Sequence, residues 1–288
     1  MNFEFSKRIS GVQASAIREI LKMMNDPEII SFGGGNPASE TFPVNKLKEI
    51  SNDIFNTKPN SILEYGITEG DINFKKAALD FLSRHETVLK DYDEVMVTSG
   101  SQQIMDFMSK CLCDEGDVVI CENPSFLGAL NAFKSNGAKL VGIEMEDDGI
   151  NLAKLEEALN KQKKPKFIYL IPNFQNPTGI SYSLEKKKRI LELAKIYDFY
   201  IIEDDYLSEL IYNDSVEYIP FKWLDKCNRV IYIKSFSKIF LPGIRLGYLV
   251  APPRFREIME ISKLNTDITT SSLMQRALEE YISSEKWK

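Results

Sequence analysis

The sequence predicts an α/β protein with a mostly parallel sheet that is covered by helices on both faces. From residue 44 onward, segments with helical spacing of apolar residues alternate with short, continuous apolar runs. Alternation of this kind is typical of a parallel sheet buried between helices. The apolar runs also end in turn residues such as Gly, Pro and Asn, as expected where a buried strand reaches a loop.

The individual elements follow from the same pattern. Helices are predicted at 44–56, 71–84, 102–112, 124–135, 151–161 and 184–197. Strands are predicted at 94–98, 117–121, 139–143, 166–171, 199–203, 229–233 and 246–250. Beyond residue 253 the pattern is helical only, and the chain shows no internal repeat or low-complexity segment.

The composition is that of a soluble globular protein and argues against several kinds of partner. A net charge of −6 and a pI near 5.2 argue against nucleic acid, which requires basic patches. No apolar run approaches the roughly 20 residues that span a membrane. The single histidine and the lack of a Cys-x-x-Cys pair argue against a zinc site, and we expect the four cysteines to be buried thiols of a cytoplasmic protein.

Three predicted strands lead to chemically useful side chains. The strand at 166–171 leads to Asn176 in an Asn-Pro-Thr-Gly turn, and the strand at 199–203 leads to two aspartates and Tyr206. The strand at 229–233 leads to Lys238. Because ligands bind beyond the carboxyl ends of strands in open α/β sheets, we expect these groups to share a site.

Lys238 is suited to a covalent bond with an aldehyde. A neutral amine condenses with a carbonyl, but a free lysine titrates near ~10.4 and needs a cationic neighbour or an apolar pocket to lose its proton. Arg245 can supply that charge and bind a phosphate. Ser235 and Ser237 precede the lysine. Taken alone, the motif is also compatible with a solvated lysine after a strand.

A glycine turn after the strand at 94–98 forms a second candidate for anion binding. The segment Ser99-Gly100-Ser101-Gln102 opens a predicted helix, and the free N–H groups at a helix N-terminus attract anions. Ser101 is equally compatible with a simple role as a helix cap.

These motifs resemble those of the fold-type-I pyridoxal-phosphate enzymes of the aspartate aminotransferase superfamily. The branch most similar to this chain holds 2-aminoadipate and aromatic aminotransferases and the effector domains of MocR-type regulators. The resemblance covers essentially all 288 residues. It is strongest in Asn-Pro-Thr-Gly at 176–179, Glu-Asp-Asp-Tyr at 203–206, and Ser-Phe-Ser-Lys followed by Pro-Gly-Ile-Arg-Leu-Gly at 235–247.

The resemblance implies an aminotransferase that moves an amino group between an amino acid and a 2-oxo acid through a Schiff base of pyridoxal 5'-phosphate with Lys238. The resemblance favours Asp204 as the acid that faces the pyridine nitrogen and keeps it protonated, with Asp205 as the alternative. Three adjacent acids cannot all be buried and ionised, so we expect Glu203 and Asp205 to find other partners or water.

The other implied contacts surround the cofactor. They are Gly100, Ser101, Gln102, Ser235, Ser237 and Arg245 for the phosphate, Phe126 for stacking on the ring, and Asn176 and Tyr206 for the phenolic oxygen. From the sequence alone, Phe126 is as compatible with a place in the core. Gly35 and Asn176 are implied to contact the substrate. Tyr65 is implied to reach the phosphate of a neighbouring subunit, which predicts a homodimer with shared active sites.

The predicted domains are an N-terminal arm with a glycine loop (1–43), a large cofactor-binding domain (44–253), and the helical start of an incomplete small domain (254–288). Family members continue into a segment that carries an arginine for the substrate carboxylate, and no residue of this chain matches it. We therefore expect a C-terminally truncated chain that binds cofactor but transaminates poorly. Two alternatives stay open: a pyridoxal-phosphate lyase on the same fold, and a non-catalytic, MocR-like ligand-sensing domain.

Overall fold

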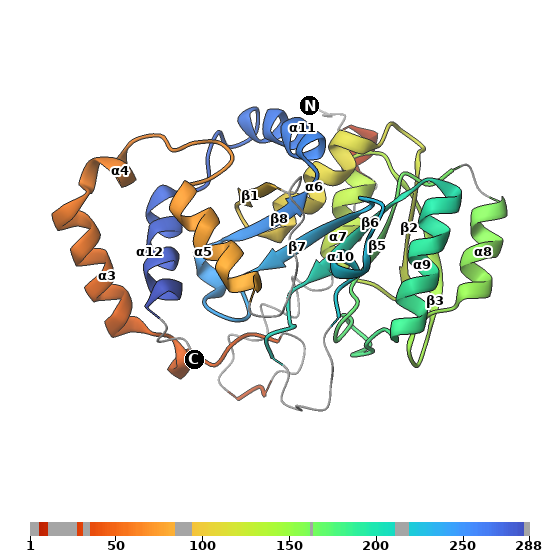
Figure 1. Ribbon diagram of the computed structural model, residues 1–288, viewed down its shortest axis with the longest axis horizontal. Helices are drawn as coiled ribbons and strands as arrows, with labels where there is room; N and C mark the ends of the chain where they lie inside the picture. Colours follow the sequence, from red (N-terminus) through yellow and green to blue (C-terminus); the bar gives the residue numbers. More distant parts are fainter. Residues whose placement is uncertain are drawn as a thin grey trace.

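The structure, a computed structural model, describes residues 6–10, 28–30, 35–83, 94–161, 164–210 and 219–284. These residues form an eight-stranded sheet with the strand order β1-β8-β7-β6-β5-β2-β3-β4. Helices lie on both of its faces (Figure 1). The α/β class that the sequence predicts is confirmed.

The parallel strands occupy the middle of the sheet. The strands are β1 (Glu94–Thr98), β2 (Val118–Asn123), β3 (Lys139–Glu146), β4 (Gly149–Ile150), β5 (Phe167–Leu170), β6 (Tyr200–Asp205), β7 (Val230–Ser235) and β8 (Gly247–Ala251). β3, β2, β5, β6 and β7 are parallel neighbours. β8 is antiparallel to β7 and β1, and β4 is antiparallel to β3. The carboxyl ends of the parallel strands therefore lie together.

The helices bury apolar stripes against the two faces of the sheet. They are α1 (Lys7–Ser10), α3 (Val44–Thr57), α4 (Pro59–Leu63), α5 (Ile72–Ser83), α6 (Ser101–Leu112), α7 (Leu127–Ser135), α8 (Leu152–Lys161), α9 (Leu184–Tyr197), α10 (Phe221–Leu224), α11 (Pro253–Leu264) and α12 (Ser272–Ser283), with 3-10 turns η1 (Ser39–Thr41) and η2 (Pro242–Ile244). α6, α7 and α11 share a core with Ile202 of β6. On the opposite face, α8, α9 and α10 pack around Ile201, and α5 and α12 pack around Tyr232.

Strands β6 and β7 extend further than the sequence predicts. Their predicted ends are 203 and 233, but Asp204 pairs with Ile233 and Asp205 pairs with Lys234. The neighbouring strand satisfies the backbone N–H and C=O groups of these polar residues, so the strand continues through the acids. Because successive strand residues point to opposite faces, Asp204 and Asp205 face opposite sides of the sheet.

Other differences are smaller. The helix predicted to begin at 124 begins at Leu127, because its N-cap residue Phe126 has an extended backbone. The expected burial of all four cysteines is wrong: Cys121 is buried, Cys111 and Cys113 are partly buried, and Cys227 is exposed. Cys227 lies in the turn between α10 and β7, outside the apolar cores.

The segment beyond residue 253 is helical, as predicted, through α11 and α12. α11 packs on α6 and β1, whereas α12 packs on α3, α4 and α5 around Ile50, Ile54 and Ala277. The predicted domain boundary at 253 stays a prediction.

Among the described residues, no helix is both long and apolar enough to cross a bilayer. The same residues contain no cluster of His, Cys, Asp and Glu side chains that could hold a metal ion.

Candidate active site

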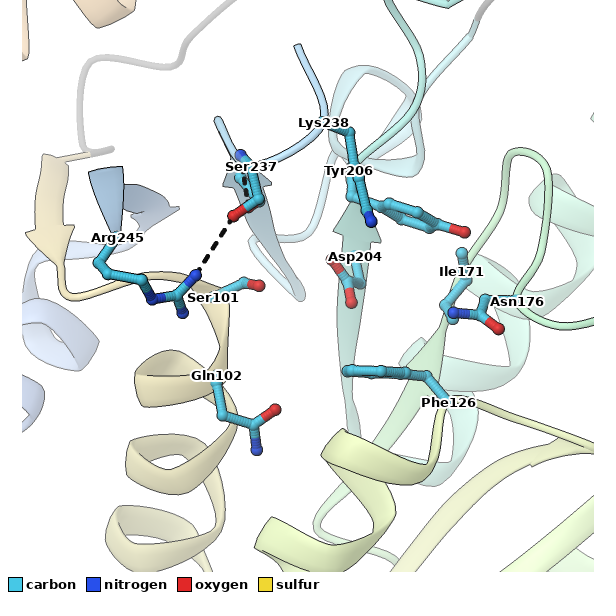
Figure 2. A pocket seen from close by; sticks show the side chains of 11 residues that line it. Ser101, Gln102, Phe126, Ile171, Asn176, Asp204, Tyr206, Ser237, Lys238 and Arg245 are labelled. Atoms are coloured by element: carbon cyan, nitrogen blue, oxygen red, sulfur yellow. Dashed lines mark hydrogen bonds between the residues drawn. The ribbon is translucent and has the colours of Figure 1, made fainter. Parts of the chain in front are cut away.

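A cavity of about 260 Å³ lies beyond the carboxyl ends of the parallel strands (Figure 2). Its lining residues are Ser101, Gln102, Phe126, Ile171, Asn176, Asp204, Tyr206, Ser235, Ser237, Lys238 and Arg245. They come from β6, β7, the N-terminus of α6 and the loops that follow β2, β5, β6, β7 and η2. The fold thus brings together side chains that are far apart in the sequence.

One side of the cavity collects groups that bind anions. Gly100 has a φ of 84° and precedes α6, and a Cβ at this position would lie 2.4 Å from an Nη2 atom of Arg245. A glycine is therefore required for the arginine to approach the start of the helix. Arg245 donates from Nη1 to Ser237 Oγ at 3.5 Å and to the Pro242 carbonyl at 3.2 Å, and Figure 2 shows its guanidinium facing Ser101.

The adjoining wall is formed by α7 and its preceding loop. Gln102 donates from Nε2 to the Gly128 carbonyl at 2.8 Å. A Cβ on Gly128 would lie 2.4 Å from Cζ of Phe126, so a glycine is needed for the ring to lie across the helix start. In Figure 2, the Phe126 ring and Lys238 lie on opposite sides of Asp204. The ring therefore presents an aromatic face to the cavity.

Asp204 is buried, yet only one of its two carboxylate oxygens has a partner among the described residues. Oδ2 accepts a hydrogen bond from the Tyr169 hydroxyl at 2.6 Å, whereas Oδ1 is buried without one. Burial raises the pKa of Asp204 to about 6, and the hydrogen bond from Tyr169 opposes that rise. A buried acceptor without a partner is costly in a folded protein, and a protonated ring nitrogen in the cavity would satisfy it.

Lys238 enters the cavity from the loop after β7. Its Nζ donates to Asn36 Oδ1 at 3.2 Å, and the side chain is half-buried. Partial burial lowers the pKa of Lys238, which increases the fraction of neutral amine. The lysine therefore has the environment that a nucleophilic amine needs.

Asn176 and Tyr206 border the cavity near Lys238 (Figure 2). The Tyr206 hydroxyl donates to the Phe174 carbonyl at 3.4 Å, and burial raises the pKa of Tyr206 to about 12. The phenol therefore stays protonated near neutral pH and can donate a hydrogen bond. Asn176 also lines the cavity, and its amide can donate a hydrogen bond to a ligand bound there.

A buried glutamate joins the two loops that carry Phe126 and Asn176. Glu122 Oε2 accepts from Gln175 Nε2 at 2.9 Å and from Ser125 Oγ at 3.3 Å. Its Oε1 accepts from the Ile171 N–H and the Tyr182 hydroxyl, both at 2.9 Å. Burial raises the pKa of Glu122 to about 7. This carboxyl fixes the spacing of the loops around the cavity.

The structure brings most of the predicted residues together. Ten of the predicted residues line the cavity, and Gly100 contacts Arg245 beside it. Gly35 does not line it, although its neighbour Asn36 contacts Lys238. Tyr65 is 81% exposed and lies outside the lining, so its predicted contact with a second subunit stays a prediction. As expected, Glu203 and Asp205 find partners away from the cavity. Glu203 accepts hydrogen bonds from two backbone N–H groups of α10.

Four residues around the cavity were not predicted. They are Ile171, Tyr169, Glu122 and Asn36. Tyr169 lies within an apolar strand, where an aromatic residue is expected for packing alone. Glu122 lies near the end of β2, where a polar residue is common. Their roles depend on contacts across the sheet that spacing along the chain does not reveal.

The sequence matches the family "Aminotransferase class I and II" over residues 27–288. This chain belongs to that family. It is 38% identical to aromatic-amino-acid aminotransferase 1 of Thermococcus litoralis over 283 residues, which cover 96% of this chain and 67% of the relative. The chain therefore spans about two thirds of the length of that relative.

Two further relatives bear on the cofactor and on the alternative functions. The crystal structure of LysN, the alpha-aminoadipate aminotransferase of Thermus thermophilus in complex with N-(5'-phosphopyridoxyl)-L-leucine, superposes with a TM-score of 0.87 at 34% identity. The match covers 98% of this chain and 71% of the other. The probable regulatory protein MocR of Rhizobium meliloti is 31% identical over 89% of this chain and 51% of its own length. Membership of the family implies pyridoxal phosphate as cofactor, and the cavity has the acceptor, the cations and the amine that such a group requires.

Proposed function

We propose that this chain is a pyridoxal-phosphate-dependent aminotransferase that moves an amino group between an amino acid and a 2-oxo acid. The observation that carries the proposal is the convergence of three groups on one cavity: the amine of Lys238, the guanidinium of Arg245, and Oδ1 of Asp204, which has no partner among the described residues. Few other cofactors require a nucleophilic amine, a buried carboxylate and an anion site in the same cavity.

Each group has a role in holding the cofactor. Gly100, Ser101, Gln102, Ser235, Ser237 and Arg245 would bind the phosphate. Phe126 would stack on the ring, Asp204 would accept from the ring nitrogen, and Asn176 and Tyr206 would donate to the phenolic oxygen. When bound, pyridoxal phosphate supplies an electron sink for the charge that develops on the substrate α-carbon.

Lys238 has two functions in this proposal. Its neutral Nζ would hold the cofactor covalently through the aldehyde group, and the same atom would take up a proton from the substrate α-carbon. Asp204 would stabilise positive charge at the ring nitrogen while Lys238 carries that proton. We further propose that the protein is cytoplasmic and forms a homodimer in which Tyr65 approaches the partner's anion site.

Reconstitution with pyridoxal phosphate tests the proposal. The protein should acquire near-ultraviolet to violet absorbance, and borohydride should fix a pyridoxyl group on Lys238 in peptide mass mapping. A label on Lys234 or no label would contradict it. Turnover should be measured with aromatic amino acids and 2-aminoadipate as donors and 2-oxoglutarate as acceptor, because the relatives are named for such donors.

The same assay separates the alternatives. A lyase would release the 2-oxo acid without an acceptor, whereas an aminotransferase requires one. A sensing domain would bind cofactor and amino acid without turnover. Sedimentation should give a dimer, and a monomer that binds cofactor with undiminished affinity would contradict the shared site.

A further inference from the structure

The two oxygens of Asp204 have different partners, and the difference comes from one tyrosine. The Tyr169 hydroxyl lies 2.6 Å from Oδ2, and Oδ1 has no partner among the described residues. The side chain of Asp204 points into the cavity (Figure 2). One oxygen is therefore held by the protein, and the other is available to a ligand.

The register of the sheet explains how Tyr169 reaches the acid. Tyr169 of β5 pairs with Ile202 of β6, so Asp204 lies two residues further along the same face of β6. Diagonal neighbours at this spacing are within reach of a long aromatic side chain. Tyr169 is fully buried, and its ring packs edge-on against Phe133 with centroids 5.5 Å apart. The hydroxyl is thus fixed in direction by its packing.

We propose that Tyr169 is a positioning residue that holds Asp204 with Oδ1 toward the cavity and keeps it ionised, so that the ring nitrogen of bound pyridoxal phosphate stays protonated. This inference rests on the proposed function. Tyr169 itself does not line the cavity, so it acts only through Asp204.

The charges around Asp204 show why a donor is needed. Burial and the neighbouring Asp205 raise the pKa of Asp204, whereas the Tyr169 hydroxyl and Lys234 lower it. Of these two, only Tyr169 touches the acid, because Lys234 pairs with Asp205 on the other face. Without the hydroxyl, the carboxylate is more basic and competes with the ring nitrogen for its proton. Tyr206 and Glu122 are the other titratable groups near this network.

The sheet also provides a matched control. The Tyr232 hydroxyl donates to Asp205 Oδ2 at 2.6 Å, and Tyr232 is almost as buried as Tyr169. Tyr232→Phe therefore removes the same kind of bond, of the same length, from the adjacent aspartate on the opposite face.

The experiment compares wild type, Tyr169→Phe, Tyr232→Phe and Asp204→Asn, each loaded with pyridoxal phosphate that carries 15N at the ring nitrogen. In Tyr169→Phe, the nitrogen resonance should move toward the neutral-pyridine position found in Asp204→Asn. The dissociation constant for the cofactor should rise about tenfold, as expected for the loss of one hydrogen bond to a charged group. Tyr232→Phe should change neither quantity.

An unchanged nitrogen resonance in Tyr169→Phe, or an equal displacement in Tyr232→Phe, would overturn the inference and leave the proposed function intact. A wild-type protein that takes up no pyridoxal phosphate would overturn both. If Tyr169→Phe does not fold, 3-fluorotyrosine at position 169 keeps the shape and strengthens the donor. That protein should bind cofactor at least as tightly as wild type, and a shift toward neutral pyridine would count against the inference.

Discussion

Strands β6 and β7 lead to two aspartate–lysine pairs with opposite surroundings. Asp205 and Lys234 are both fully buried and lie 3.2 Å apart. Lys234 also pairs with Glu209 at 2.5 Å and donates to Ser208 Oγ at 2.6 Å. Asp204 and Lys238 face the cavity instead: Asp204 has one oxygen without a partner among the described residues, and Lys238 donates to an uncharged amide oxygen.

The comparison distinguishes an aspartate and a lysine that stabilise the fold from an aspartate and a lysine that are available for chemistry. Around Lys234, the acids raise the pKa of the amine above its ordinary value despite burial, so it stays charged. Around Lys238, burial lowers the pKa, so the neutral amine is more accessible. A charge that is fully paired contributes to the fold, whereas one left without a partner in a cavity is available to a ligand.

Lys238→Met is the substitution with the largest expected effect on function. It removes the proposed nucleophile and base, so turnover should fall by roughly 10³-fold or more. The free energy of unfolding should change by no more than about 1 kcal/mol, because the side chain is half-buried and donates to a neutral acceptor. Steady-state kinetics and urea unfolding measure the two effects. Substantial unfolding would show that Lys238 has a structural role after all.

Lys234→Met should show the reverse pattern. It leaves Asp205 and Glu209 without their shared cation, and breaking a buried ion pair costs about 3–5 kcal/mol. Urea unfolding of the apoprotein measures the loss. The Asp205→Asn/Lys234→Met double variant should lose less than the sum of the two single variants, since the two charges of the Asp205–Lys234 pair are then removed together. Additive losses would mean that the pair is not coupled.

The two aspartates should differ in the same way when each is replaced by asparagine. Asp204→Asn should reduce turnover by roughly 10²- to 10⁴-fold while leaving the fold as stable as before or slightly more stable near neutral pH, because burial disfavours the charged form of Asp204 and asparagine carries no charge. Asp205→Asn should destabilise the fold by about 2–4 kcal/mol and affect turnover less. Equal effects on turnover would mean that the assignment of Asp204 is wrong.

The sequence alone predicts many of the residues at the cavity, but not why one aspartate and one lysine face it while another such pair is buried on the other side of the sheet. Asn176, Asp204, Tyr206 and Lys238 could be predicted, because each follows an apolar run in a motif that resembles those of the family. Arg245 could be predicted because it stands in the same motif as Lys238. The direction of each acid could not, since it depends on where β6 ends, and the predicted end at 203 is wrong. Pairing with β7 continues to Asp205 and fixes which acid faces which side.

The hydrogen-bond partners on other strands could not be predicted from the sequence for a related reason. Within apolar strands, Tyr169 and Tyr232 are expected only to pack in the core. Their role as donors becomes apparent only from the register, which places their hydroxyls 2.6 Å from adjacent acids. Ser208 and Glu209 lie beyond the recognisable motif and reach Lys234 through the backbone turn after β6. Long-range pairing, which has no local signal, decides these contacts.

The dependence of stability on pH gives the smallest effect and tests the surroundings of Asp204 directly. The pKa of Asp204 is raised to about 6, so folding favours its protonated form. Its contribution to the free energy of unfolding is therefore greatest below about pH 4 and is lost as the pH rises toward 6. Asp204→Asn should remove this part of the decline, which is on the order of 2 kcal/mol. Urea unfolding of the apoprotein between about pH 4.5 and 7.5, in steps of about half a unit, measures it.

Two other buried acids provide an internal control for that measurement. The pKa values of Glu203 and Glu122 are each raised to about 7 by burial, so the decline in stability between about pH 6 and 7 should persist in Asp204→Asn. The wild-type and variant curves should therefore differ in slope below about pH 6, with the variant the flatter of the two, and become parallel above it. If the curves are parallel throughout, Asp204 has the same protonation in the folded and unfolded states. In that case the cavity does not hold the buried carboxylate, with one oxygen lacking a partner among the described residues, that distinguishes it from the surroundings of Asp205.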